Sequence, residues 1–148
     1  MTMTGIDRHV SAAHMVLGKD LNPHDTLFAG QAASYMIECG FLAVQSFLNS
    51  GHIVCLGLDG LRFLRPVRKG DTIDISSTVV YAGTTSVGAH IAMTRRSDGA
   101  MAAECFVSFV HIEEETGQAR PHGVTLPALD EQGEARRRAY WAYKGMTV

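Results

Sequence analysis

The chain has 148 residues, a length that suggests one domain over 1–148 with a hydrophobic core of ordinary size. Hydrophobic residues make up 46% of it and charged residues 19%, which excludes a disordered composition. The formal net charge of −2 gives no electrostatic reason to expect nucleic-acid binding, although a local basic patch can still hold a small anionic ligand.

The three cysteines, Cys39, Cys55 and Cys105, are widely spaced, lie in apolar runs and form no C-x-x-C pair. This pattern predicts buried free thiols in a reducing cytoplasm, and neither a disulfide framework nor a zinc site. The first residues lack the apolar core of a signal peptide, and polar residues interrupt the longest apolar run, so we expect no membrane partner. The seven histidines lack metal-ligand spacing, and we expect neither a metal nor a cofactor.

The first predicted elements are a strand and a long helix. Residues 9–17 predict the strand, and residues 18–24 predict a loop that leads into the helix. Asp25 or Thr26 can cap the first helical amides, and Gly51 lies where a stop residue belongs. About 24 residues without proline separate these signals, which predicts a helix roughly 35 Å long.

The predicted helix is apolar on most of its circumference, which indicates burial. At about 100° per residue, its main polar side chains fall within a stripe about 60° wide; they are Gln31, Ser34, Glu38, Gln45 and Asn49. Glu38 is the only ionisable carboxylate in this stripe, and burying a carboxylate is costly unless it is paired or used. Two interpretations remain open: the stripe meets a polar surface such as a site, or it is the solvent-exposed edge of the helix.

Four β-rich segments follow the helix and are joined mostly by short turns; they span 53–67, 71–82, 86–95 and 101–112. Alternation in the second segment places Tyr81 on the same face as Ile73 and Val79. Alternation in the third places His90 on the outward face, opposite Ile91. After an irregular tail, residues 129–144 predict a final helix.

The order of these elements predicts an α+β domain. One strand precedes the long helix and four follow it, so the sheet is expected to be antiparallel with about five strands. Because the helix is apolar nearly all round, the simplest way to bury it is for the sheet to wrap around it.

A candidate site lies where the loop before the helix meets the first helical turn. The chain has no nucleophile elbow, phosphate-binding loop or zinc-protease motif. A helix N-terminus exposes amide donors, and the small residues Ala29 and Gly30 leave these amides open to a carbonyl oxygen. Asn22 can hold a water or a carbonyl group, unless it only forms the turn before Pro23. Glu38, about two turns further along, can act as a base or a nucleophile.

Four segments carry motifs that occur together, in this order, in one family. They are residues 22–38 (NPHDTLFAGQAASYMIE), 63–71 (FLRPVRKGD), 83–86 (GTTS) and 106–112 (FVSFVHI). The first three resemble the N-x-x-G-T-L-F-G-G-x-x-x-x-x-x-D-E, F-x-x-P-V-x-x-G-D and G-x-[ST]-S motifs of hotdog-fold acyl-CoA thioesterases of the acyl-CoA hydrolase type, and the fourth is similar to their final strand. The resemblance covers roughly residues 12–127, which is most of the chain.

The resemblance implies a hotdog fold and hydrolysis of acyl-CoA thioesters, with coenzyme A present only as part of the substrate. It also implies a homodimer that pairs its sheets edge to edge and forms two composite sites, and a trimer of dimers, a hexamer, as the larger assembly. With the candidate site above, it predicts Glu38, Asn22 and Gly30 as catalytic residues. The expected substrate contacts are His24, Ala29, Arg62, Arg65, Arg68, Gly83, Thr84, Thr85 and Ser86.

The sequence departs from the family pattern at three positions. Asp25 and Ala29 stand where the family has glycine, and Ile37 stands where it usually has the catalytic aspartate. Ile37 lies off the polar stripe, whereas Glu38 lies on it, so we expect Glu38 to replace the aspartate.

Three functions therefore compete. Hydrolysis of acyl-CoA is the leading hypothesis, and a non-catalytic acyl-CoA-binding hotdog protein that has lost the aspartate is the second. A hotdog hydratase or dehydratase is the third, and it is disfavoured because the H-F-P-G and D-x-x-x-x-H segments of those families are not visible. Release of a thiol from acyl-CoA separates the first hypothesis from the second.

Overall fold

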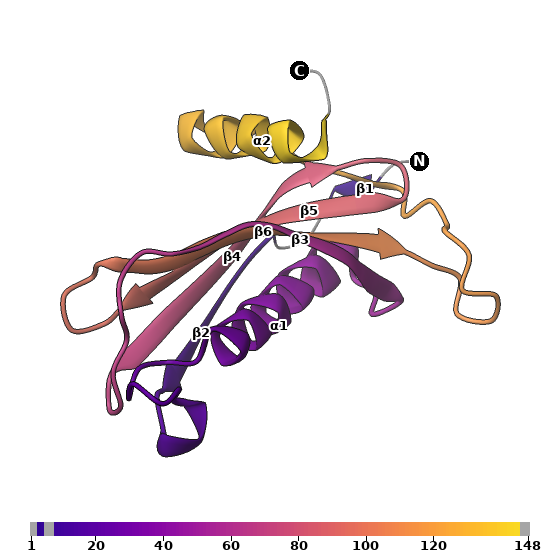
Figure 1. The fold of residues 1–148 in the computed structure, drawn as a ribbon. Helices are drawn as coiled ribbons and strands as arrows, with labels where there is room; N and C mark the ends of the chain where they lie inside the picture. Colours follow the sequence, from indigo (N-terminus) through magenta and orange to yellow (C-terminus); the bar gives the residue numbers. More distant parts are fainter. Residues whose placement is uncertain (1–2, 5–7, 146–148) are drawn as a thin grey trace.

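The fold is a curved antiparallel sheet with one long helix on its concave face (Figure 1). The computed structural model describes residues 3–4 and 8–145. Helix α1, Ala29–Leu48, packs mainly against the two strands β4 and β5 at the middle of the sheet. The predicted α+β class is therefore confirmed. Five strands pair in the order β2-β4-β5-β6-β3; they are β2 His9–Met15, β3 Ile53–Phe63, β4 Thr72–Ala82, β5 Ser86–Arg95 and β6 Met101–His111.

Shorter elements extend this core. The 3₁₀ turn η1, Gly18–Asp20, follows β2, and the parallel pair β1, Met3–Thr4, and β7, Val124–Thr125, forms a small second sheet. Helix α2, Glu131–Lys144, lies across the convex face of the main sheet, opposite α1 (Figure 1). Asp130 caps α2 by accepting a hydrogen bond from the N–H of Gly133 at 2.7 Å, so this helix begins slightly later than predicted.

Helix α1 lies close to the sheet because the residues on its contact face are apolar and some of them are small. Met36, Ala43 and Phe47 are buried at the spacing that a 3.6-residue period requires. A Cβ added at Gly40 would lie 2.8 Å from Cδ1 of Ile91, so a larger residue there would push α1 away from β5. The helix has 20 residues and is therefore about 30 Å long, somewhat shorter than predicted.

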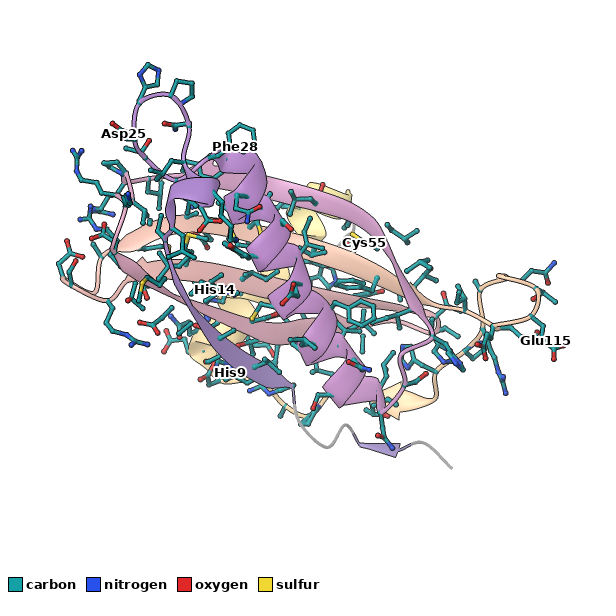
Figure 2. The ribbon with its side chains drawn as sticks, turned by 90° about the horizontal axis from the view of Figure 1, so that it is seen from below. His9, His14, Asp25, Phe28, Cys55 and Glu115 are labelled. Carbon is teal, nitrogen blue, oxygen red and sulfur yellow. The ribbon has the colours of Figure 1, made fainter. Side chains whose placement is uncertain are left out.

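Both ends of α1 differ from the prediction. The helix starts after Phe28, which makes no side-chain capping hydrogen bond. Asp25 lies in the preceding loop and has a φ of 60°. The helix cannot begin there, because the Phe28 N–H bonds to the carbonyl oxygen of Asp20 at 2.8 Å. At the other end Asn49, in the left-handed region with a φ of 52°, stops the helix before Gly51. Figure 2 shows Asp25 in the loop that projects beyond the start of α1.

A β-bulge changes which face of the sheet one tyrosine occupies. Ile73, Ile75 and Val79 point toward α1, as the alternation predicts. The pairing of β4 with β5 shifts between Val79 and Tyr81, and Tyr81 stacks instead on Tyr140 of α2, with ring centroids 5.3 Å apart. The prediction that Tyr81 shares the face of Val79 is wrong, because one extra residue reverses the alternation beyond it.

Helix α2 covers part of the convex face, over strands β4 and β5. Tyr140 lies over Gly88, where an added Cβ would be 2.5 Å from its ring, and its hydroxyl is 2.8 Å from Oγ of Ser108. Beneath this helix His90 is only 2% exposed, and its Nε2 is 2.8 Å from Oε1 of Glu104. His90 thus lies on the outward face, as predicted, but the residues packed under α2 bury it there. Burial lowers the pKa of His90, against the opposing effect of Glu104.

Strands β2 and β3 form the two edges of the main sheet. β2 ends at Met15 and β3 at Phe63, so both are shorter than predicted. The start of β3 exposes apolar side chains, including 64% of Leu56, and Cys55 beside it is exposed rather than buried as predicted. In the part of the chain that the structure describes, no further strand pairs with the outer side of β3, and this edge position explains the exposure. Within the described residues neither helix has the length and hydropathy needed to cross a lipid bilayer.

Candidate functional site

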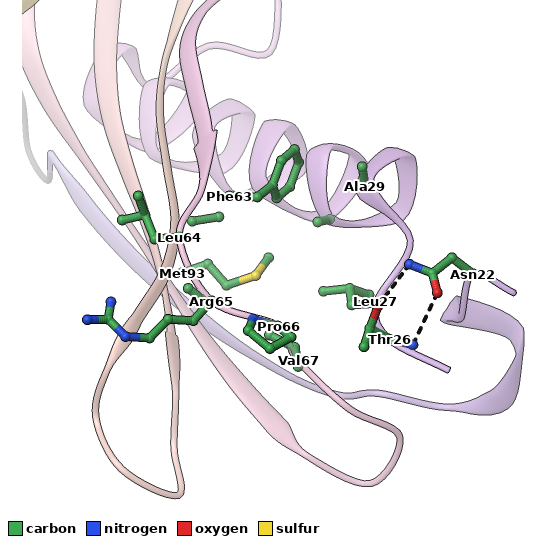
Figure 3. Close-up of a pocket in the computed structure, with 13 residues that line it drawn as sticks. Asn22, Thr26, Leu27, Ala29, Phe63, Leu64, Arg65, Pro66, Val67 and Met93 are labelled. Atoms are coloured by element: carbon green, nitrogen blue, oxygen red, sulfur yellow. Dashed lines mark hydrogen bonds between the residues drawn. The ribbon is translucent and has the colours of Figure 1, made fainter. Parts of the chain in front are cut away.

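An apolar pocket lies between the start of α1 and the end of β3 (Figure 3). Its volume is about 330 Å³, within the range of small-molecule sites. The loop before α1 and the first turn of α1 form one wall, and the ends of β3, β5 and β6 with the segment after β3 form the rest. The lining residues are Asn22, Thr26, Leu27, Ala29, Ala32, Phe63, Leu64, Arg65, Pro66, Val67, Met93, Ala102 and Ala103.

The first turn of α1 brings unpaired amide donors to this pocket. The N–H of Ala32 bonds to the carbonyl oxygen of Phe28, whereas those of Ala29, Gly30 and Gln31 have no acceptor within the described part of the chain. The first turn also contains no acidic side chain. The positive end of the helix dipole therefore has no acidic side chain of the helix itself beside it, and Ala29 places this end at the pocket wall.

Asn22 reaches the pocket from the loop before α1. Its Oδ1 accepts a hydrogen bond from the N–H of His24 at 2.9 Å. Figure 3 shows its two bonds to Thr26, in which Oδ1 accepts from the N–H at 3.2 Å and Nδ2 donates to Oγ1 at 2.8 Å. Asn22 thus forms the turn that the simpler interpretation expected. It also keeps one Nδ2 hydrogen for a ligand, because a side-chain amide has two N–H donors.

Two other residues predicted around Asn22 lie outside the pocket lining. His24 is exposed in the turn, although its backbone N–H supports Asn22. Gly30 lies against the exposed ring of Phe28, and a Cβ added at Gly30 would be 2.6 Å from Cε2 of that ring. Glycine at this position therefore allows Phe28 to fold over the first turn of α1.

Glu38 does not share the pocket with Asn22 in a single chain. It is exposed on α1, nine residues after Ala29 and so about 14 Å further along the helix axis. Ile37, about 100° around the helix from Glu38, is partly buried against the core.

The polar stripe on α1 is partly the solvent-exposed edge of the helix and partly in contact with another polar group. Four of its members, Ser34, Glu38, Gln45 and Asn49, are exposed and form the solvent edge of the single chain. The fifth member, Gln31, donates a hydrogen bond to the buried carboxylate of Asp20 at 2.8 Å.

The predicted basic contacts separate into two groups. Arg65 lines the pocket and donates to the carbonyl oxygen of Met101 at 2.8 Å, and Arg68 is exposed in the turn that follows. Arg62 instead donates to Oε2 of Glu104 at 2.8 Å, the carboxylate that also contacts His90. Only Arg65 of the predicted arginines therefore lines the pocket.

The predicted turn 83–86 lies at the opposite end of the sheet. Ser86 pairs with Val110, which pairs with Val54 at the start of β3, whereas the pocket lies at Phe63 near its end. Nine strand residues separate the two levels, a distance of about 30 Å. Gly83 and Thr84 line a second hollow of about 240 Å³ at that end, whereas Thr85 and Ser86 do not line it.

The sequence analysis did not predict the pocket walls that β3, β5 and β6 contribute. Phe63, Met93 and Ala103 meet because the strand pairing puts them at one level of the sheet. Phe63 opens the motif at 63–71, but that motif does not mark it as a pocket wall. Met93 and Ala103 belong to apolar strands and carry no local signal that singles them out.

The model of the thioesterase superfamily matches residues 24–102 of this chain. The acyl-CoA thioester hydrolase YkhA of Bacillus subtilis, itself uncharacterized, is 25% identical over 117 residues, covering 76% of this chain and 67% of YkhA. The acyl-CoA thioester hydrolase YciA of Escherichia coli is 31% identical over 77 residues, covering 52% of this chain and 58% of YciA.

The structural comparison concerns the whole chain. The crystal structure of an apo-hexameric acyl-CoA thioesterase matches with a TM-score of 0.86 at 21% identity, covering 98% of this chain and 94% of that one. At 21% identity, this structural similarity is evidence of the fold alone. The predicted hotdog fold, with its sheet wrapped around α1, is thereby confirmed.

Proposed function

The chain belongs to the thioesterase superfamily, and we propose that it hydrolyses acyl-CoA thioesters to the free acid and CoA. One observation carries the proposal: the uncapped N-terminus of α1 opens onto an apolar pocket beside the amide of Asn22. An acyl group needs an apolar pocket, and a thioester carbonyl needs a few converging hydrogen-bond donors.

In this proposal the thioester oxygen accepts hydrogen bonds from the free amides of Ala29 and Gly30 and from Nδ2 of Asn22. These donors stabilise the negative charge on that oxygen when the carbonyl carbon becomes tetrahedral. Glu38 takes a proton from the attacking water, or attacks the carbonyl carbon itself. Collapse of the tetrahedral intermediate breaks the C–S bond, and the sulfur of CoA leaves as the thiolate. A direct attack leaves an acyl–Glu38 anhydride, which water then hydrolyses to the free acid.

The proposal takes Glu38 and Ala29 of each site from different chains, because of the distance between them. About 14 Å of helix separates them, so the carboxylate that serves one pocket comes from the α1 of a second copy. We therefore include a homodimer in the proposal, with a trimer of dimers as the larger assembly. A hexameric relative of the same fold supports this assembly. A cytoplasmic location is also part of the proposal, supported by three unpaired cysteines.

A second candidate function is acyl-CoA binding without hydrolysis. Ile37 occupies the position at which the resembling family usually has its aspartate, and it packs against the core instead of offering a proton acceptor. Glu38 is exposed in the single chain. Both observations fit a protein that holds the ligand and has lost the catalytic group.

Release of a free thiol from a panel of acyl-CoAs, from acetyl to palmitoyl, tests the proposal. Hydrolysis predicts steady turnover on at least one member of the panel, detected with a thiol reagent. The exposed Cys55 also reacts with such a reagent, so a run without substrate provides the baseline. Thermal stabilisation by acyl-CoA with no thiol release would favour the binding protein.

Asn22→Ala is expected to lower kcat by about 10²-fold or more, the typical effect of removing an oxyanion donor. The change should raise KM less, because the carbonyl oxygen gains most of its charge only in the transition state. Steady-state kinetics on the preferred acyl-CoA measures both constants. Thr26→Ser is the matched control, because it keeps the hydroxyl that receives the Asn22 hydrogen bond. An effect on KM alone would mean that Asn22 only positions the substrate.

The phosphates of CoA are proposed to meet Arg65 and Arg68 of one chain, with turn 83–86 of a second copy near the same site. Charge reversal at both arginines should raise KM for acyl-CoA about tenfold or more, since a hydrogen bond to a charged group is worth about 1.5 kcal/mol or more. KM for a small thioester without the nucleotide should not change. Arg138→Glu, an exposed change on α2, is the control. Equal losses on both substrates would contradict nucleotide recognition here.

A further inference from the structure

One carboxylate outside the pocket is fully buried and fully hydrogen-bonded. Asp20 has 0% exposure, although it lies in the short turn η1 next to solvent-exposed residues. Its Oδ2 accepts the Leu17 N–H at 2.8 Å, and its Oδ1 accepts from Gln31 and Tyr35 at 2.8 Å and from Lys19 at 3.2 Å. A buried carboxylate is tolerated only when its lone pairs are satisfied in this way.

These bonds join η1, the loop that carries Asn22 and the first two turns of α1. The Leu17 amide is the entry to the loop that carries Asn22, and the carbonyl oxygen of Asp20 accepts from the N–H of Phe28, its exit. Gln31 and Tyr35 belong to the first two turns of α1. Asp20 therefore makes a hydrogen bond at each end of loop 17–28 and links that loop to α1, the helix whose Ala29 lines the pocket.

We propose that Asp20 is a positioning residue, which holds the Nδ2 of Asn22 and the first amides of α1 in the arrangement that receives the thioester carbonyl. This rests on the proposed function, because the residues it positions act there. Asp20 itself does not line the pocket and touches no substrate. A misplacement of about 1 Å in such donors can cost about 10²-fold in rate, which gives a remote carboxylate a large influence on kcat.

The titration of Asp20 agrees with this arrangement. Burial alone would raise the pKa of the carboxyl group, but the bonds from Leu17, Tyr35, Gln31 and Lys19 outweigh it and hold the pKa at about 2. The carboxylate therefore stays ionised across the working range of a cytoplasmic enzyme.

Asp20→Asn tests the proposal, because asparagine keeps the shape but turns an N–H donor toward groups that also donate. Its kcat for acyl-CoA should fall about 10- to 100-fold, with KM changed much less. Backbone amides of Leu17 and Phe28 should exchange with solvent faster than in the wild type, by mass spectrometry or NMR. Tyr35→Phe, which removes one donor and keeps the ring stacked on His14, should give a smaller fall in kcat and covers the case in which Asp20→Asn does not fold.

A matched control distinguishes a positioning role of Asp20 from a role in stability alone. Tyr140→Phe removes a buried hydrogen bond to Ser108 on the opposite face of the sheet, so it should lower Tm while leaving kcat unchanged. Unchanged exchange and kcat in Asp20→Asn, or an equal fall in kcat for Tyr140→Phe at the same loss of Tm, would overturn the proposal. The exchange measurement does not need turnover. A wild type that hydrolyses no acyl-CoA, with loop exchange still dependent on Asp20, would therefore overturn the proposed function and the catalytic part of this inference, but not the anchoring.

Discussion

Replacing Glu38 by glutamine is expected to lower kcat for acyl-CoA hydrolysis by about 10²- to 10⁴-fold, the usual contribution of a catalytic base. Glutamine keeps the size of the side chain but can neither take a proton from water nor attack the thioester. Glu38 is the only carboxylate on α1, so no neighbour on that helix can replace it. Because the side chain is exposed, the substitution should change Tm little. Thiol release at saturating acyl-CoA measures the effect.

Gln45→Ala is the matched control for this prediction. Gln45 lies on the same exposed edge of α1 as Glu38, about two turns further along, and forms no part of the pocket lining. Its replacement should leave kcat and KM unchanged. An unaltered kcat in Glu38→Gln would remove the carboxylate from the mechanism.

Helix α1 and the five strands could be predicted because apolar periodicity is a local property of each segment. The start of α1 could not, because it depends on bonds to distant residues. Leu27 and Phe28 donate their N–H groups to Val67 and Asp20, which holds them in extended conformation and delays the helix to Ala29. A capping side chain at Asp25 is a reasonable local signal, but these long-range bonds prevail over it.

The direction of a side chain could be predicted only while the alternation stayed regular. Tyr81 lies beyond a bulge, and His90 lies under α2, so neither environment follows from its own segment. Cys55 shows the opposite case, an apolar run that is exposed because β3 is an edge strand. Burial of this kind is a tertiary property, set by which elements cover which face.

The candidate site could be predicted where one short segment supplies it. Asn22 and Ala29 belong to one motif and both line the pocket. The strand walls could not be predicted, because they require the register of three strands. The predicted contacts at Arg65 and in turn 83–86 lie at opposite ends of one chain, about 30 Å apart. The resemblance predicts that both contact the substrate, but in a single chain they are too far apart to contact the same site.

A second copy of the chain can unite these two ends. Strand β3 is an edge with unpaired backbone groups and exposed apolar side chains, a surface that favours pairing. If two copies pair β3 with β3 about a two-fold axis, the strands run antiparallel. The start of one β3 then lies against the end of the other. Turn 83–86 of one copy therefore lies at the end of the sheet where the pocket of the other copy opens.

Disruption of this edge is therefore expected to abolish activity and not merely reduce it. Val54→Arg with Leu56→Arg places two charges on the exposed start of β3, and neither residue lines the pocket. Because the start of one β3 faces the end of the other, the added charges would be buried without a partner in the paired edge and should hold the copies apart. Light scattering at micromolar concentration should then report a monomer of about 16.0 kDa. That monomer should show no measurable turnover, because Glu38 of a second copy no longer reaches the pocket.

Met15→Arg is the control for this experiment, since it charges an equally exposed apolar residue on the other edge of the sheet. It should leave the dimer and its kcat intact. Dilution of the wild type provides an independent measurement, because specific activity should fall in step with the dimer fraction. A stable monomer of the double variant with full activity would contradict the composite site. It would mean that one chain places a proton acceptor at its own pocket, and that Glu38, about 14 Å along α1, is not that acceptor.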